Sequence, residues 1–206
     1  MAPCRYTISP QFFYPGFIRL KGNSGSMRER FAFLQERGCG FAAEREFIVF
    51  AGLCFLSFAT PILLPQPQLL TGTVVNALIV AGALHFGWRK LLPVLVLPSM
   101  GAVAAGMLFG PFTIHLLYMA PFIWAGNFIL AAAVKYFALA GKSFLSGAVL
   151  GAGAKAAFLF CSAYALFSFG LVPAAFLAAM GIMQLFTALA GGALGKGLSH
   201  ILVSWK

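Results

Sequence analysis

After residue 46 the chain alternates between long apolar runs and short interruptions made of proline, glycine, lysine and arginine. Each run approaches or exceeds the about 20 apolar residues that cross the hydrocarbon core of a bilayer as a helix. Because the interruptions are short, consecutive helices should lie antiparallel in one compact bundle. The pattern therefore predicts an all-α polytopic membrane protein with six spans, over residues 47–64, 69–86, 91–109, 112–138, 144–169 and 171 to about 195.

The first 46 residues follow a different pattern. Proline and glycine interrupt short aromatic clusters up to about residue 26, and arginine and glutamate then alternate with apolar residues as far as Glu46. The second of these patterns predicts a short amphipathic helix on the membrane surface, broken at the glycines of residues 38–40. We therefore divide the chain into a cytoplasmic or interfacial arm, residues 1–46, and a transmembrane domain, residues 47–206.

Charge gives this bundle an orientation. The chain is 61% hydrophobic and 9% charged, with a formal net charge of +10, and a soluble protein needs far more charged surface than that. Basic residues in short loops stay cytoplasmic, and here Arg89, Lys90, Lys142 and Lys196 all fall on the side of the first 46 residues, whereas the opposite turns carry no charge. We predict a multi-pass protein of the inner (cytoplasmic) membrane with both termini in the cytoplasm.

The acidic residues exclude whole classes of mechanism by their positions. All of them lie within the first 46 residues, at Glu29, Glu36, Glu44 and Glu46. Ion-coupled transporters and intramembrane aspartyl or metalloproteases need a carboxylate inside the membrane. The chain also has no P-loop for ATP, and no histidine or cysteine pair has metal-ligand spacing. We predict a protein that is not an enzyme and that has no metal site and no cofactor of its own.

One lysine stands out among the polar residues of the spans. Lys155 lies roughly 16 Å along its helix, near the middle of a core about 30 Å thick, and no carboxylate is available to pair with it. Its ammonium group either extends back to the cytoplasmic surface or faces an internal cavity that holds water or an anionic ligand. Three amides on other helices, Asn76, Asn127 and Gln184, lie at similar depths and either join helices or share that cavity. Four polar residues from four helices favour the shared cavity.

Other candidates surround this group. His115 lies one turn inside the outer end of its helix, where it could contact a ligand at the mouth of a pocket, and aromatic residues such as Trp124 could form its walls. Small residues at four-residue spacing, such as Gly147 with Gly151 and Gly191 with Gly195, allow helices to pack closely or to dock another protein. The candidate substrate-binding residues are Thr73, Asn76, His115, Trp124, Asn127, Lys155 and Gln184.

Three segments carry a family resemblance. Residues 71–78 (TGTVVNAL), 119–127 (MAPFIWAGN) and 184–192 (QLFTALAGG) resemble the substrate-binding S component of energy-coupling-factor (ECF) transporters, and the similarity extends over roughly residues 47–198. The resemblance implies a six-helix protein that captures a vitamin or another micronutrient from outside the cell. It also implies a transmembrane coupling protein and two cytoplasmic ATPases as partners, which use the ATP. Asn76, Asn127 and Gln184 would then line the pocket or support it.

Two other functions remain open at this stage. The chain could be a non-transporting membrane subunit that scaffolds a partner complex through its small-residue faces, or a facilitator that works without coupling. The expected partners are a small molecule and the lipid bilayer, and not nucleic acid. The preference for a polar or anionic molecule depends mainly on Lys155, and the sequence does not identify that molecule.

Overall fold

The computed structural model describes residues 26–106 and 114–204, and it describes side chains over residues 44–106 and 114–202. The chain divides into two units, Met1–Phe41 and Ala42–Lys206, and the bundle that follows belongs to the second. The first helix, α1 (Ser26–Leu63), begins in the first unit and continues through residues 38–40, where the sequence predicts a break. That prediction is wrong because a glycine costs a helix interior only about 1 kcal/mol, and strong helix formers flank these two.

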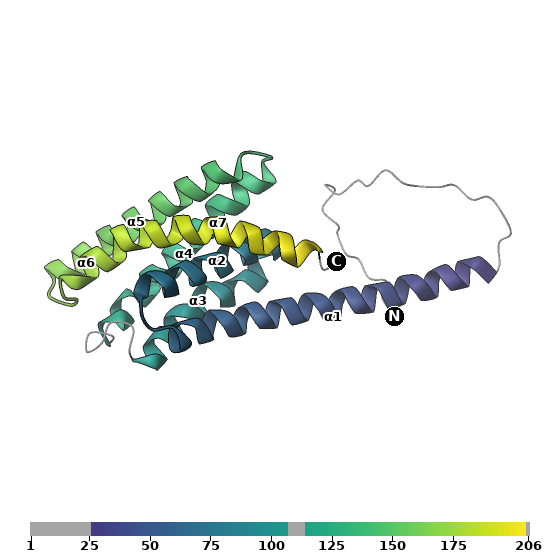
Figure 1. Cartoon of the computed structure of the whole chain (residues 1–206), viewed down its shortest axis with the longest axis horizontal. Coiled ribbons are helices and arrows are strands. Elements are labelled where there is room, and N and C mark those ends of the chain that lie inside the picture. The colour runs from purple at the N-terminus through teal and green to yellow at the C-terminus, as the bar shows by residue number, and fades with distance from the viewer. Residues whose placement is uncertain (1–25, 107–113, 205–206) are drawn as a thin grey trace. The chain divides into compact units, whose positions relative to one another are not determined.

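Helices account for all the regular structure of the described residues (Figure 1). Five of these segments are long and apolar enough to cross a membrane, and one of them combines α6 with α7. The chain is therefore all-helical, with the spans of a multi-pass membrane protein. After α1 the helices are α2 (Gln68–His85), α3 (Trp88–Ala105), α4 (Leu116–Leu139), α5 (Phe144–Ser168), α6 (Ala175–Met180) and α7 (Ile182–Ser204).

The third predicted span differs from the other five. Helix α3 is not among the segments that satisfy the length and hydropathy of a span, because its first turn contains Arg89 and Lys90 and its interior contains Pro93 and Pro98. The predicted continuation of this span to residue 109, and the predicted start of the next one at residue 112, lie outside the described residues. Helix α4 is described from Leu116 onward.

Most of the other boundaries follow the local sequence, but the final span begins at Ala175 instead of residue 171 and continues to Ser204 instead of about residue 195. Breaks occur as predicted at residues 64–67, at Gly87 and at Gly141, and the last of these has a positive φ of 63° that favours glycine. The final span is predicted as one helix, but it divides at Gly181 into α6 and α7. A Cβ atom at Gly181 would lie 2.9 Å from the carbonyl oxygen of Leu177 and 3.0 Å from the ring of Phe160, so this bend packs against α5 only as glycine.

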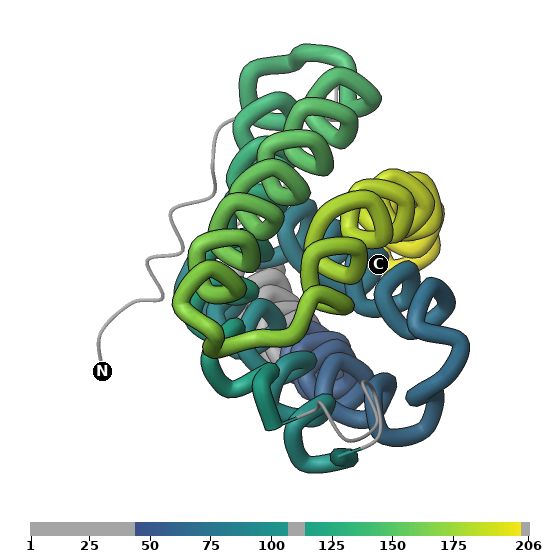
Figure 2. The backbone as a smooth tube through the Cα atoms, turned by 90° about the vertical axis from the view of Figure 1, so that its left-hand side faces the viewer, coloured from purple at the N-terminus to yellow at the C-terminus, as the bar shows by residue number. Residues whose placement is uncertain are grey.

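Close helix contacts depend on the small residues that the sequence shows at four-residue spacing. A Cβ atom on Gly191 would lie 2.5 Å from Cβ of Asn76, and one on Gly195 would lie 2.6 Å from the carbonyl oxygen of Ala77, so α7 touches the backbone of α2. Gly147 and Gly151 likewise bring α5 close to α4, where Cβ atoms on them would lie 2.7 Å from Cβ of Phe137 and 2.9 Å from Cβ of Ala133. Figure 2 shows both pairs, with α7 in yellow beside α2 and α5 in green beside α4. These stripes are buried within the chain and therefore serve packing.

The bundle has two chemically different ends. Short turns make consecutive helices antiparallel, so that Arg89, Lys90, Lys142 and Lys196 lie toward one end, which we call the basic end. At this end Lys135 of α4 donates hydrogen bonds to carbonyl oxygens near the end of α2, at 3.1 Å and 2.6 Å. The turns over residues 64–67 and 169–174 form the opposite, uncharged end.

Large apolar side chains are exposed along the helices between these ends. Phe47 and Phe55 of α1 are each 67% exposed, and Leu145 of α5 is 68% exposed. A soluble protein rarely leaves such long apolar surfaces open to water, whereas a membrane protein presents them to lipid. The core lies around α2, where the side chains of Ile79 and Val80 are completely buried.

Candidate functional site

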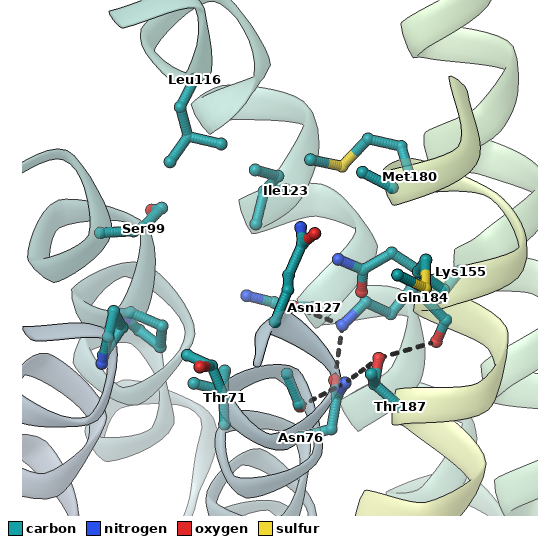
Figure 3. Close-up of a pocket in the computed structure, with 18 residues that line it drawn as sticks. Thr71, Asn76, Ser99, Leu116, Ile123, Asn127, Lys155, Met180, Gln184 and Thr187 are labelled. Atoms are coloured by element: carbon teal, nitrogen blue, oxygen red, sulfur yellow. Dashed lines mark hydrogen bonds between the residues drawn. The ribbon is translucent and has the colours of Figure 1, made fainter. Parts of the chain in front are cut away.

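A cavity lies within the bundle (Figure 3). Pro61 and Gln68, which flank the turn over residues 64–67, line it and place it toward the uncharged end. Its volume is about 80 Å³, several times the about 10–15 Å³ that one buried water molecule needs. Residues from all seven described helices line it, so the site depends on the assembled bundle. Its polar lining consists of four amides, three hydroxyls and one ammonium group: Gln68, Thr71, Asn76, Ser99, Asn127, Lys155, Gln184 and Thr187.

Lys155 is the charged group of this cavity. Its side chain is only 2% exposed. Its Nζ atom donates hydrogen bonds to Oδ1 of Asn76 at 2.6 Å and to Oδ1 of Asn127 at 2.8 Å. Of the two alternatives that the sequence leaves open for this lysine, the structure has the internal cavity, and the ammonium group does not extend to the basic end.

No carboxylate neutralises Lys155 within the domain. The sequence contains no aspartate or glutamate after Glu46. Glu46 itself forms an ion pair with Lys90 at 2.8 Å, on the surface at the basic end. An isolated buried charge is costly unless it is paired, and two amide oxygens supply partial charges rather than a full one. In its ammonium form Lys155 therefore has no counter-ion among the residues of the domain.

Both amides are held in place by hydrogen bonds from their nitrogen atoms. Nδ2 of Asn76 donates to the carbonyl oxygen of Gly72 at 2.9 Å and to the hydroxyl of Thr187 at 3.2 Å. Nδ2 of Asn127 donates to the carbonyl oxygen of Leu95 at 2.9 Å. These bonds turn both Oδ1 atoms toward Lys155. The lysine is thus held by a network that joins α2, α3, α4, α5 and α7.

Few hydrogen-bond donors of the cavity remain for a ligand. The hydroxyls of Thr71 and Ser99 donate to carbonyl oxygens of Leu64 and Val96. An ammonium group has three N–H bonds, and Lys155 uses two of them within the network. The side-chain amide of Gln184 lines the cavity on the side of Lys155 (Figure 3) and forms no hydrogen bond with the part of the chain that the structure describes.

The structure brings together four of the seven candidate residues. Asn76, Asn127, Lys155 and Gln184 all line the cavity, from α2, α4, α5 and α7, as expected from their similar depths. Their common position is the feature that the sequence predicts best. It follows from counting along antiparallel helices, because residues at equal distances from the same end of a bundle lie at the same level.

The other three candidates lie outside the cavity. Thr73 does not line the cavity. It lies where α2 packs against α7, and its carbonyl oxygen faces Gly191 of α7. Nδ1 of His115 lies 3.0 Å from the carbonyl oxygen of Leu171, so this side chain joins the start of α4 to the turn before α6. Trp124 does not line the cavity, and its indole nitrogen donates to the hydroxyl of Ser99, at 2.5 Å, from behind the wall.

Three hydroxyl residues of the cavity are missing from the candidate set. Thr187 follows Gln184 by three residues, and this i, i+3 spacing on one helical face is a signal present in the sequence. Thr71 lies one turn before Val75, which also lines the cavity, but only the structure shows that this face of α2 points inward. Ser99 follows a proline in α3, and a serine there has no distinctive pattern.

Metal binding finds no support at this site. In the described part of the chain, no three side chains of histidine, cysteine, aspartate or glutamate are grouped so that they could hold a metal ion.

The chain matches no family model, and neither a curated protein nor a solved structure is significantly similar to it.

Proposed function

We propose that the chain is the substrate-capture (S) subunit of an ECF-type ATP-driven importer for a micronutrient such as a vitamin, and that it binds a small polar or anionic molecule in an outward-facing pocket. The observation that carries the proposal is the buried ammonium group of Lys155, which lies in a cavity of a domain without carboxylates. An anionic ligand would supply the missing charge.

The direction of the pocket follows from the distribution of charge. The cavity lies toward the uncharged end, and basic residues mark the opposite end. If basic loops remain in the cytoplasm, the cavity opens to the outside of the cell, and both termini are cytoplasmic. On this topology α3 also crosses the membrane, which gives six spans, and the protein resides in the inner (cytoplasmic) membrane. Pro98 of α3 is buried in the bundle, whereas Arg89 and Lys90 of its first turn are exposed at the basic end.

The source of energy follows from what the sequence lacks. The domain has no carboxylate that could carry a coupling proton or sodium ion, and the chain has no P-loop for ATP. An importer built in this way depends on partners for energy. We infer a transmembrane coupling protein and two cytoplasmic ATPases, in line with the resemblance of residues 47–198 to S components.

The test is to purify the full chain from its own membrane in mild detergent and to identify the co-purifying proteins and small molecules by mass spectrometry. We expect two ATPases, a coupling protein and a small ligand. The ligand should be lost in Lys155→Met and retained in Lys142→Met, which removes an exposed lysine at the basic end.

Two outcomes would replace the proposal. Solute flux through liposomes that contain the chain alone would identify an uncoupled facilitator. A partner complex that assembles normally in both Lys155→Ala and Asn127→Ala, with no ligand and no ATPase in the wild-type preparation, would identify a scaffold subunit.

A further inference from the structure

The chemistry of the cavity walls narrows the class of ligand. Resting on the proposed function, we infer that the cavity takes a short monocarboxylate: a molecule with one negative charge, no positive charge and a compact apolar body. Three independent features of the cavity support this class, namely its charge, its unused hydrogen-bond donors and its size.

The charge of the lining selects a monoanion. Lys155 is the single cationic residue among those that line the cavity, and none of them is acidic. A zwitterion such as an amino acid would bring an ammonium group that has no anionic partner here. A dianion would bring a second negative charge without a cation. Either charge would be buried without compensation, which is costly at such a site.

The unused donors match one carboxylate. Lys155 has one N–H left after its bonds to Asn76 and Asn127, and the amide of Gln184 has its donors left. One donor for each oxygen completes a carboxylate group. The amide of Gln68 also lines the cavity, but Gln68 precedes Asn76 by eight residues, about 12 Å along α2, and so lies near the uncharged end. A sugar or another ligand with many hydroxyl groups would find few partners.

The rest of the cavity wall is apolar, and the space that it encloses is small. Leu116, Ile123 and Met180 lie across the cavity from Asn76 and Thr187 (Figure 3). The volume of about 80 Å³ is roughly half that of an apolar cavity of about 150 Å³ that binds benzene. The body of the ligand is therefore a chain of a few carbon atoms.

The experiment measures binding to the purified full chain in detergent by titration calorimetry, at constant pH and ionic strength. Propionate is compared with its neutral analogue propionamide, with the zwitterion β-alanine, with the dianion succinate, with the inorganic ions chloride and nitrate, and with the larger benzoate. A hydrogen bond to a charged group is worth a tenfold to hundredfold change in affinity, so propionate should bind at least about tenfold more tightly than each of the others.

Variants then test the residues. Lys155→Met should remove the preference for propionate over propionamide, and Gln184→Leu should weaken propionate several-fold. Asn127→Asp places a carboxylate where an amide oxygen now lies 2.8 Å from Nζ, and this internal counter-ion should abolish propionate binding. The variant loses the bond from Nδ2 to the carbonyl oxygen of Leu95 but gains an ion pair with Lys155. Lys142→Met should bind propionate as the wild type does. Thermal denaturation of each variant checks that it is folded. If Lys155→Met does not fold, Asn127→Asp still tests the inference.

Each contrary result overturns a stated part of the inference. Absent binding of propionate, or equal affinity for propionate and propionamide, would refute the anion. Tighter binding of succinate or β-alanine would refute the single charge, chloride or nitrate equal to propionate would refute the apolar body, and tighter binding of benzoate would refute the size. A different ligand delivered by an ATPase complex would overturn this inference alone. Propionate flux through the chain without partners would instead overturn the proposed function.

Discussion

Replacing Gly191 by alanine tests how α7 is held against α2. A Cβ atom at this position would lie 2.5 Å from Cβ of Asn76, 2.7 Å from the carbonyl oxygen of Thr73 and 2.9 Å from the nitrogen of Ala77. Two of these contacts are with backbone atoms, which cannot rotate away. The adjacent Gly192 is a matched control, because a Cβ atom there would meet Cβ of Ala148 at an ordinary distance of 3.5 Å.

The expected magnitude follows from these contacts. Forcing an extra carbon into a packed interface typically costs about 1–3 kcal/mol. Both substitutions replace glycine by alanine inside the same helix, which by itself favours the helix by up to about 1 kcal/mol. This propensity term cancels between the two variants. Gly191→Ala should therefore be less stable than Gly192→Ala by about 1–3 kcal/mol.

The assay is unfolding of both variants and the wild type by SDS titration in mixed micelles, followed by titration of propionate. Because the clash at Gly191 falls on the residue that holds Lys155, Gly191→Ala should also weaken propionate binding, whereas Gly192→Ala should leave it unchanged. Equal stability of the two variants would refute the close approach of α7 to α2. Lower stability with unchanged affinity would refute only its link to the cavity.

Two further substitutions probe places away from the cavity. Lys135→Met removes two hydrogen bonds from a charged donor to carbonyl oxygens near the end of α2, so the free energy of unfolding should fall by about 1–3 kcal/mol while propionate affinity stays the same; lower affinity would contradict the separation of the two ends. Ser57→Ala removes a buried hydroxyl that has no partner among the described residues, so stability in the same titration should stay constant or rise by about 1 kcal/mol, and a clear loss would show that the hydroxyl has a partner.

The helix boundaries show where local sequence is sufficient and where it is not. The break at residues 64–67 follows from two prolines, and the break at Gly141 coincides with a positive φ, which are both properties of the residues themselves. The bend at Gly181 lies inside an unbroken apolar run. A Cβ atom there would be crowded by the carbonyl oxygen of Leu177 and by the ring of Phe160 in α5, and nothing near Gly181 in the sequence indicates the contact with Phe160.

For the candidate site, the sequence predicts how far along its helix each residue lies but not the direction in which its side chain points. Depth along a helix can be counted from the sequence, and the counts for Asn76, Asn127, Lys155 and Gln184 place them at one level, where the structure has its cavity. Direction depends on how each helix is rotated about its axis. The helices here are apolar on most sides, so apart from the pair Gln184 and Thr187 on α7 the sequence offers little from which rotation could be predicted. Trp124, next to Ile123 of the wall, therefore points behind the cavity instead of into it.

The small residues determine how each helix packs against its neighbours. Helix packing therefore affects the proposed binding of an anion. Gly191 determines how closely α7 approaches Asn76, and Gly151 determines how closely the helix of Lys155 approaches α4. The positions of the two amide oxygens relative to Nζ depend on both distances. A carboxylate in the domain would hold the lysine without such precision, but it would also neutralise the charge. Amides held by close helix packing position the ammonium group and leave its charge without a counter-ion, as the proposed binding of an anion requires.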